Sequence, residues 1–169
     1  VGEGVRLGAR CELLSHVVIQ GDTEIGEACR FFPFSAVGLE PQDLKYRGER
    51  TRVRIGRGNQ FRENCTVHAG TAGGGGTTTI GDQNLFMATT HVAHDCAVGS
   101  HTIFANAATL AGHVHVEDHA VIGAFSGVHQ FCRIGSHAYI GGYSVITQDA
   151  LPYVLTVGNR ARAFGINLV

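Results

Sequence analysis

Tryptophan is absent from this chain of 169 residues, which has only one methionine and three prolines. Charged residues make up only 16% and leave a net charge of −1, which argues against a broadly basic nucleic-acid surface. The chain has no run of about 18 apolar residues that would span a membrane, and Val1 already lies inside the repeat described below. With a hydrophobic content of 44% in one domain's length, we expect a folded, cytoplasmic protein.

A period of six residues dominates the chain. An aliphatic residue or phenylalanine stands at every sixth position from Ile80 to Ile146, and the residue four positions after each of them is nearly always small. This period fits neither the 3.6 residues per turn of a helix nor the two-residue alternation of a lone strand. It predicts an all-β fold, a parallel β-helix with three flat faces, in which residues i and i+18 stack.

Two insertions interrupt this period, which also runs through residues 1–37 and 55–67. The first insertion, about residues 39–52, is polar and charged, and the second, 69–79, contains the run Gly73–Gly76. Both are predicted to leave the prism as loops, and such loops often carry function because the repeat is committed to packing. The glycine run lacks the Lys-Ser/Thr ending of a phosphate-binding loop, so we interpret it as a flexible loop.

Glycine and cysteine both fit the repeat. The 24 glycines suit tight corners at positions with positive φ. The cysteines are odd in number and fall on the small inward position of the repeat, so we predict buried free thiols rather than disulfides or metal ligands: Cys11, Cys29, Cys65, Cys96 and Cys132.

Ten histidines are the chemical anomaly of a near-neutral chain. Five take outward or corner positions and are interpreted as solvated surface residues: His16, His101, His115, His119 and His137. The other five lie near the second insertion and on the coils that follow it, and they are the candidates for chemistry: His68, His91, His94, His113 and His129.

The stacking of residues 18 apart predicts how these histidines are arranged in space. It places residues 18 apart in columns, one formed by His94, Gly112 and Gln130 and the next by Asp95, His113 and Phe131. Adjacent coils are about 4.8 Å apart, so the carboxylate of Asp95 neighbours both His94 and His113. Gly112 has no side chain to shield its N–H from a developing oxyanion. A base, an orienting acid and such a donor are the parts that an acyl transfer needs.

Two alternatives remain at this point. His94 and Asp95 could be an ordinary surface pair, or His91 and His94 could bind zinc, as histidines do in trimeric β-helices of the gamma carbonic anhydrase type. That family's histidine pair has a spacing that no pair in this chain shows, so we predict no metal. No serine lies in a nucleophile-elbow sequence and the cysteines point inward, which favours direct attack by a substrate hydroxyl that a histidine deprotonates.

Four segments together carry a specific resemblance: QDLKYRGE (42–49), HVAHDCAVG (91–99), NAATLAGHVHVEDHAVIG (106–123) and VHQFCRIG (128–135). They closely resemble the bacterial acyl-carrier-protein-dependent UDP-N-acetylglucosamine 3-O-acyltransferases, over essentially the whole chain. The resemblance implies a left-handed β-helix and a homotrimer with active sites between subunits. It also implies the first step of lipid A synthesis, in which an (R)-3-hydroxyacyl group moves from the phosphopantetheine thioester of acyl carrier protein to the glucosamine 3-hydroxyl of UDP-N-acetylglucosamine, with no other cofactor.

The same resemblance implies roles for individual residues. His94 matches the general base, Asp95 its supporting carboxylate and Gly112 the oxyanion donor. Four residues match the family's nucleotide-sugar and acyl-pantetheine cleft: His91, His113, His129 and Gln130. Three others match further substrate contacts: His68, Asp43 and Lys45. Gly142 matches a chain-length ruler, where glycine leaves room for a long acyl chain. Asn167 alone remains of a downstream nucleotide-contacting stretch.

The chain also departs from this family. Ala69 stands where the family commonly has arginine, and the second insertion is unusually rich in glycine. The resemblance implies an additional N-terminal coil segment and a C-terminal helical domain, so we expect this chain to be a fragment. The alternatives are an inactive or truncated scaffold and the related N-acyltransferase of the same pathway. The QDLKYRGE segment and Asp95, rather than an asparagine after the base, argue against the N-acyltransferase.

Overall fold

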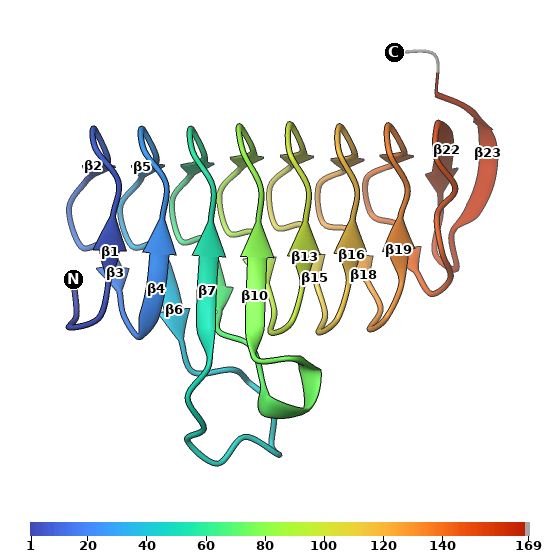
Figure 1. Cartoon of the computed structure of the whole chain (residues 1–169). Helices are drawn as coiled ribbons and strands as arrows, with labels where there is room; N and C mark the ends of the chain where they lie inside the picture. The colour runs from blue at the N-terminus through green and yellow to red at the C-terminus, as the bar shows by residue number, and fades with distance from the viewer. Residues whose placement is uncertain (168–169) are drawn as a thin grey trace.

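The computed structural model describes residues 1–167 and shows a left-handed parallel β-helix of three sheets, as predicted (Figure 1). The first sheet contains β1 (Arg6–Leu7), β4 (Asp22–Ile25), β7 (Arg52–Ile55), β10 (Thr77–Ile80), β13 (Ala97–Val98), β16 (His115–Val116) and β19 (Arg133–Ile134). The second contains β2 (Glu12–Leu13), β5 (Arg30–Phe31), β8 (Gln60–Phe61), β11 (Leu85–Phe86), β14 (Ile103–Phe104), β17 (Val121–Ile122), β20 (Tyr139–Ile140), β22 (Val154–Val157) and β23 (Arg162–Ile166). The third contains β3 (Val18–Ile19), β6 (Ala36–Leu39), β9 (Thr66–His68), β12 (His91–Val92), β15 (Thr109–Leu110), β18 (Gly127–Val128) and β21 (Val145–Ile146).

The strand register confirms the predicted stacking. On the first sheet Ala97 pairs with His115, and His115 pairs with Arg133, each 18 residues further on. The last pair departs from this rule, because β22 and β23 are antiparallel. The helical content of residues 1–167 is a single 3₁₀ turn, η1 (Ala72–Gly74). No helix in this part of the chain has the length and apolar composition needed to cross a bilayer.

The inward residues of the repeat form the core. Four phenylalanines from successive coils of the second sheet stack with ring centroids 4.7 to 4.9 Å apart and are at most 1% exposed: Phe31, Phe61, Phe86 and Phe104. All five cysteines are free thiols, buried except for the half-buried Cys11. Burial raises the pKa of the Cys96 thiol to about 12. The prediction of buried free thiols is therefore confirmed for all but the half-buried Cys11.

The corners contradict the predicted role of glycine. Most corner residues with positive φ are not glycine, and they include Asp95 (φ 58°) and His113 (φ 63°). Many glycines instead stand where a coil passes close to the next: a Cβ on Gly26 would lie 2.7 Å from the carbonyl carbon of Gly56. These glycines are needed for close approach between coils, whereas the left-handed corners accept larger side chains that point outward.

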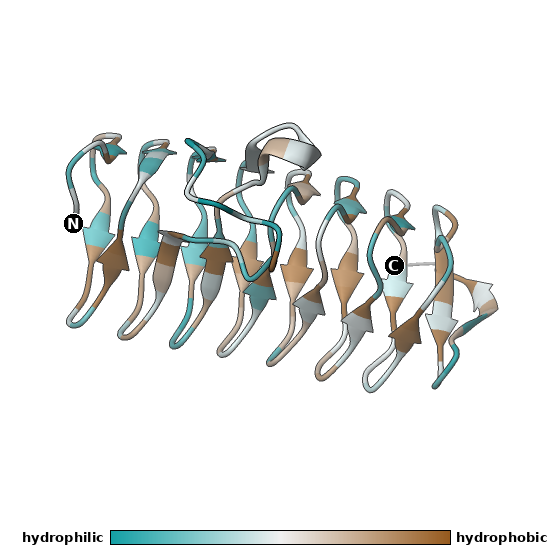
Figure 2. Ribbon diagram, turned by 90° about the horizontal axis from the view of Figure 1, so that it is seen from below, coloured by the Kyte–Doolittle hydropathy of each residue, from teal (hydrophilic) through white to brown (hydrophobic). Residues whose placement is uncertain are grey.

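Both insertions leave from the corner between the third and first sheets (Figure 1). The first spans residues 40–51 and is mostly hydrophilic, and the second spans 69–76 (Figure 2). The predicted boundaries were too wide, because Leu39 ends β6 and β10 already begins at Thr77. Thr77 to Thr79 pair with β7, and the side chain of Thr78 points into the core, so these residues continue the ladder.

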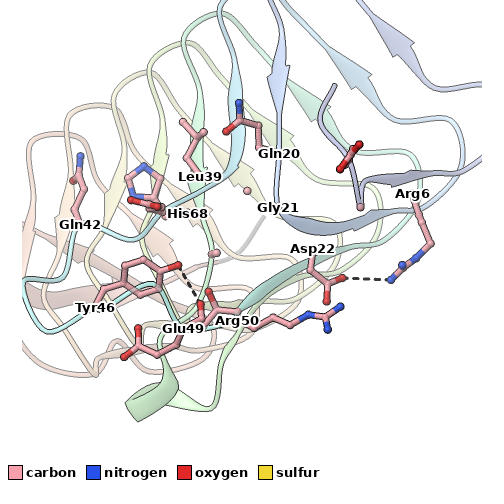
Figure 3. A pocket seen from close by; sticks show the side chains of 16 residues that line it. Arg6, Gln20, Gly21, Asp22, Leu39, Gln42, Tyr46, Glu49, Arg50 and His68 are labelled. Atoms are coloured by element: carbon pink, nitrogen blue, oxygen red, sulfur yellow. Dashed lines mark hydrogen bonds and ion pairs between the residues drawn. The ribbon is translucent and has the colours of Figure 1, made fainter.

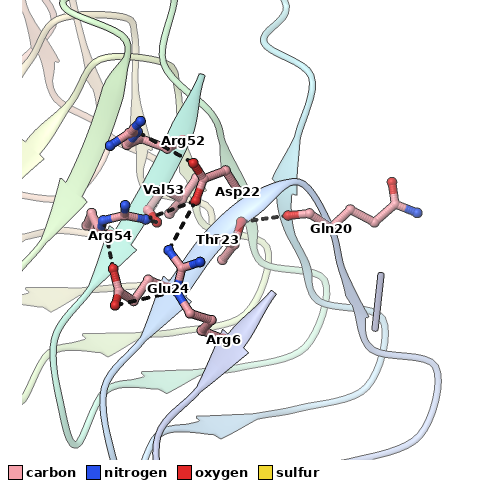
Figure 4. Close-up of polar contacts among 8 residues, drawn as sticks. All are labelled: Arg6, Gln20, Asp22, Thr23, Glu24, Arg52, Val53 and Arg54. Carbon is pink, nitrogen blue, oxygen red and sulfur yellow. Dashed lines mark hydrogen bonds and ion pairs between the residues drawn. The ribbon is translucent and has the colours of Figure 1, made fainter. Parts of the chain in front are cut away.

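Charged side chains anchor the strand that follows the first loop. The carboxylate of Asp22 on β4 lies 3.4 to 3.7 Å from guanidinium nitrogens of three arginines, Arg6 on β1 and Arg52 and Arg54 on β7 (Figure 4). Burial opposes the charge of Asp22, but these guanidinium groups hold its pKa below the usual range. The network fixes the return of the chain from the first loop to the first sheet.

Candidate active site

The candidate site lies on the same corner as the two loops. His94 and Asp95 follow β12, at the turn that leads to β13, and both are buried, with 8% and 7% of their surface exposed. The alternative of an ordinary solvated surface pair is therefore wrong. The second loop, 69–76, covers this corner and excludes water from the Asp95 carboxylate, whose side chain is completely buried.

Asp95 is held by hydrogen bonds from three directions. Its Oδ2 lies 2.9 Å from Nδ1 of His94 and accepts the Thr71 hydroxyl at 2.6 Å. The backbone N–H of Thr71 donates to Oδ1 at 2.9 Å, and the backbone N–H of Asp95 donates to Oγ1 of Thr78 at 2.9 Å. Because a carboxylate can only accept, Nδ1 of His94 carries the proton and Nε2 presents its lone pair. This is the tautomer that a general base requires.

Gly112 lies directly beside His94 on the next coil. A Cβ on Gly112 would contact Cε1 of His94 and lie 2.6 Å from Nε2. Only glycine therefore lets the backbone come this close to the imidazole. Within residues 1–167 the N–H of Gly112 has no protein acceptor, whereas the N–H of the preceding Ala111 bonds to Val128. The predicted column of base and free backbone donor is confirmed as a geometry.

His113 completes the column beside Asp95. Its ring packs edge-on to His94, with centroids 5.1 Å apart, and its Nε2 lies 4.0 Å from Oδ2 of Asp95. On its other side it stacks on Phe131, with centroids 4.5 Å apart. The side chain of Phe131 is 67% exposed, so this column ends in an open aromatic face.

His68 and His91 form a second pair on the neighbouring third sheet. Their rings meet edge-on with centroids 4.9 Å apart, and Nδ1 of His91 lies 2.7 Å from the hydroxyl of Thr66. Burial, with smaller contributions from His68 and His94, lowers the pKa of His91 to about 4. Burial and the neighbouring His94 also lower the pKa of His68. Both imidazoles are therefore neutral near pH 7, and Nδ1 of His68 lacks a hydrogen-bond partner among the described residues.

The glycines of the second loop have a structural role that the sequence did not reveal. A Cβ on Gly70 would lie 2.7 Å from Oδ1 of Asp95, and a Cβ on Gly74 would contact the whole carboxylate group. Within the run Gly73–Gly76 this role belongs to Gly74, because a Cβ on Gly73, Gly75 or Gly76 would meet nothing within 4 Å. Thr71 was missed as well, because it lies in an irregular loop that has no period, and Thr78 was missed because the predicted second insertion wrongly included it.

The remaining predicted residues lie at varying distances from this cluster. Asp43 and Lys45 are in the first loop, where Oδ1 of Asp43 accepts the Lys45 N–H at 2.9 Å. His129 and Gln130 are exposed on the same corner as His94, on the second coil beyond it. The other two lie elsewhere: Gly142 follows β20 on the corner between the second and third sheets, and Asn167 donates to the carbonyl of His137 on the corner between the first and second.

A cavity of about 770 Å³ lies beneath the first loop and next to His68 (Figure 3). Gln42, Tyr46 and Arg50 line it from the loop, and the Tyr46 hydroxyl donates to the Glu49 carbonyl at 3.1 Å. His94 is not part of its lining. The catalytic candidates therefore face outward from the corner, while His68 connects them to this cavity.

His94, Asp95 and His113 are also close enough to be considered as metal ligands, since their ligand atoms lie within 4.8 Å of one another. The hydrogen bonds argue against this use. Both oxygens of Asp95 already accept Thr71 donors, and Nδ1 of His94 is turned to Oδ2. His91, the other residue of the zinc alternative, is not part of this group. The donor set fits a hydrogen-bonded base better than a metal centre.

Comparisons with known proteins identify a family and several relatives of this chain. The family model for the bacterial transferase hexapeptide (six repeats) matches residues 113–148. A curated acyl-[acyl-carrier-protein]–UDP-N-acetylglucosamine O-acyltransferase from Thermodesulfovibrio yellowstonii is 50% identical over 100% of this chain, which covers 66% of that relative.

Two solved structures are similar over nearly the whole chain. LpxA from Acinetobacter baumannii is 51% identical with a TM-score of 0.96, and the match covers 97% of this chain and 64% of that one. The UDP-N-acetylglucosamine O-acyltransferase from Moraxella catarrhalis is 37% identical with a TM-score of 0.81, and the match covers 98% of this chain and 74% of that one. This chain thus spans about two thirds of the length of the first relatives it matches.

Proposed function

The chain belongs to the UDP-N-acetylglucosamine O-acyltransferase family, and from this membership we propose the reaction that its site performs. The chain transfers an (R)-3-hydroxyacyl group from the phosphopantetheine thioester of acyl carrier protein to the 3-hydroxyl of UDP-N-acetylglucosamine. Both substrates meet it in the cytoplasm, and the only prosthetic group involved is the pantetheine of the donor.

The observation that carries this proposal is the contact of His94 with Asp95 on one side and Gly112 on the other. Nε2 of His94 removes the proton from the sugar 3-hydroxyl, whose oxygen attacks the thioester carbonyl carbon. The resulting oxyanion accepts the N–H of Gly112. When the tetrahedral intermediate collapses, the C–S bond breaks and the imidazolium returns its proton to the leaving pantetheine thiolate. Asp95 stabilises the imidazolium between these steps.

The neighbouring histidines supply polar contacts without competing for the proton. His68 and His91 are neutral near pH 7 because burial lowers the pKa of each. With His113 they offer neutral donors and acceptors to the sugar and the acyl group, and His129 and Gln130 extend this surface to the next coil. Asp43 and Lys45 contact the substrate from the first loop, which leaves the same corner.

A homotrimer accounts for the two residues that lie on other corners. Gly142 and Asn167 are separated from His94 by whole faces of the same prism, so they join its site only if a neighbouring subunit presents another corner to it. Gly142 is exposed, and a Cβ there would contact only the backbone of Ala124, with the carbonyl oxygen at 3.3 Å. The glycine thus leaves room there, and we propose a long acyl chain as the preferred donor.

The test is transfer of a labelled 3-hydroxyacyl group from acyl carrier protein to UDP-N-acetylglucosamine by this chain and by its His94→Ala variant. We expect transfer by the parent chain, loss of most turnover in the variant and the same oligomer for both. Normal rates in His94→Ala would exclude His94 as the base. Transfer by neither protein would favour a scaffold without activity, and acylation of a 3-amino sugar instead would favour the related N-acyltransferase.

A further inference from the structure

The second loop reaches the catalytic pair through one side chain. Thr71 donates both its hydroxyl and its backbone N–H to the carboxylate of Asp95, at 2.6 and 2.9 Å. It is only 7% exposed. Its hydroxyl and Nδ1 of His94 both bind Oδ2 of Asp95, so a change in the hydroxyl contact alters the hydrogen bond of the imidazole.

The local backbone shows that this contact is preferred over an ordinary alternative. Thr71 stands at the N-cap of η1, where a threonine hydroxyl normally accepts an N–H of the first helical turn. It makes no such cap, because the hydroxyl is directed to Asp95 instead. The carbonyl of Thr71 accepts the N–H groups of Gly74 and Gly76, which fixes the loop around this residue.

The loop glycines allow Thr71 to come this close. Side chains at Gly70 or Gly74 would collide with the carboxylate of Asp95. Asp95 takes the left-handed conformation, φ 58°, that recurs at the corners of this prism. The bonds from Thr71 fix its side chain there, and the Thr78 hydroxyl accepts its backbone N–H.

We propose that Thr71 is a positioning residue of the acyltransferase, and that it acts on His94 through Asp95. It fixes the rotamer of the carboxylate and takes up part of its charge, so that His94 keeps its proton on Nδ1 and presents the lone pair of Nε2. This inference rests on the proposed function of His94. The titratable groups that face the pair are His68, His91 and His113, together with the buried thiol of Cys96.

The test compares Thr71→Val with Thr71→Ser. Valine keeps the shape and the backbone N–H but removes the hydroxyl, and we expect kcat to fall roughly 10- to 100-fold, the usual loss for one hydrogen bond to a charged group. KM for UDP-N-acetylglucosamine should stay within about twofold, because Thr71 is buried away from the substrate. With one donor fewer, Asp95 attracts the imidazolium more strongly, so the midpoint of the kcat/KM profile should move to higher pH. Serine should restore both.

Thr90→Val is the matched control. Thr90 is 1% exposed and donates to the carbonyl of Met87 on a different corner, so this variant loses a buried threonine hydroxyl without touching the site. We expect its kcat and pH profile to equal those of the parent. An equal loss in Thr90→Val, or an unchanged rate and profile in Thr71→Val, would overturn the role of Thr71.

A measurement on the folded protein separates this inference from the proposed function. The Nδ1–H proton of His94, bonded to a buried carboxylate, should give a far-downfield NMR resonance in the parent chain and in Thr71→Ser. The resonance should shift or exchange away in Thr71→Val, and its disappearance in His94→Ala assigns it. If no acyl transfer is found but this pattern holds, Thr71 positions the pair and the activity is misassigned. An identical resonance in Thr71→Val would refute the positioning role whatever the activity.

Discussion

At the residue scale, burial decides which histidines can exchange protons in the working range. His91 is packed between His68 and Thr66 and has a pKa of about 4, chiefly because of burial. The exposed His101 and His119 stack on each other with centroids 5.0 Å apart, on a corner that faces solvent. The histidines of the candidate site are therefore distinguished from the others by their corner and by the loop that covers it, not by residue type.

The lowered pKa of His91 predicts how stability depends on pH. The unfolded chain binds a proton at His91 below about pH 6.5, whereas the folded chain resists it down to about pH 4, so stability is lost as pH falls through this window. His91→Gln removes this pH-dependent contribution to stability and still offers the Thr66 hydroxyl a hydrogen-bond partner. Between pH 7 and pH 5, urea unfolding should show that the variant loses about 1–2 kcal/mol less stability than the parent.

His115→Gln on the exposed face of β16 is the control for this experiment. It should lose stability with falling pH to the same extent as the parent, because His115 is not buried. Equal pH dependence in His91→Gln and in the parent would contradict the effect of burial on His91.

At the scale of the elements, the second loop covers the carboxylate of Asp95. Gly73 and Gly74 are adjacent in this loop and differ sharply in their surroundings: a Cβ on Gly74 would contact Asp95, whereas a Cβ on Gly73 would meet nothing within 4 Å. Neither has a positive φ that would strain an alanine. Alanine substitutions at these two positions can therefore distinguish the effect of a contact with Asp95 from the effect of replacing a loop glycine.

This contrast gives a prediction for the loop. Gly74→Ala should lower kcat by roughly 100-fold, because displacing Asp95 misplaces the imidazole that it orients. Gly73→Ala, which adds the same methyl group one residue earlier, should leave kcat within about twofold of the parent. Steady-state transfer assays on both variants provide the measurement. Similar rates for the two would mean that the loop moves away from Asp95 during turnover.

The elements also show what the sequence could and could not predict. The six-residue period determined the register, so the columns through His94 and Gly112 and through Asp95 and His113 were predictable. The contact of Thr71 with Asp95 was not, because the loop between them has no repeat to fix its path. The antiparallel pairing of β23 was missed for a related reason, since Arg162–Ile166 lies beyond the last regular hexad.

At the scale of the whole molecule, the prism separates residues that the proposed reaction needs together. His94 lies on the corner between the third and first sheets, and Gly142 on the corner between the second and third. A rigid stack of coils held by the phenylalanine column cannot bend one corner onto another. The proposed site therefore requires His94 from one chain and Gly142 from its neighbour in the proposed trimer.

Mixed assembly of two variants tests this requirement. His94→Ala removes the base, and Gly142→Trp is expected to block the acyl path while leaving the fold intact, because Gly142 is exposed and a Cβ there would contact only Ala124. Each variant alone should be inactive toward a long-chain donor. When the two are refolded together in equal amounts, about one quarter of the sites should combine an intact His94 with an intact Gly142 from the next subunit. Mixing the variants after assembly should restore nothing. Inactivity of the co-refolded mixture would show that both residues act within one chain, and activity of Gly142→Trp alone would place Gly142 outside the site.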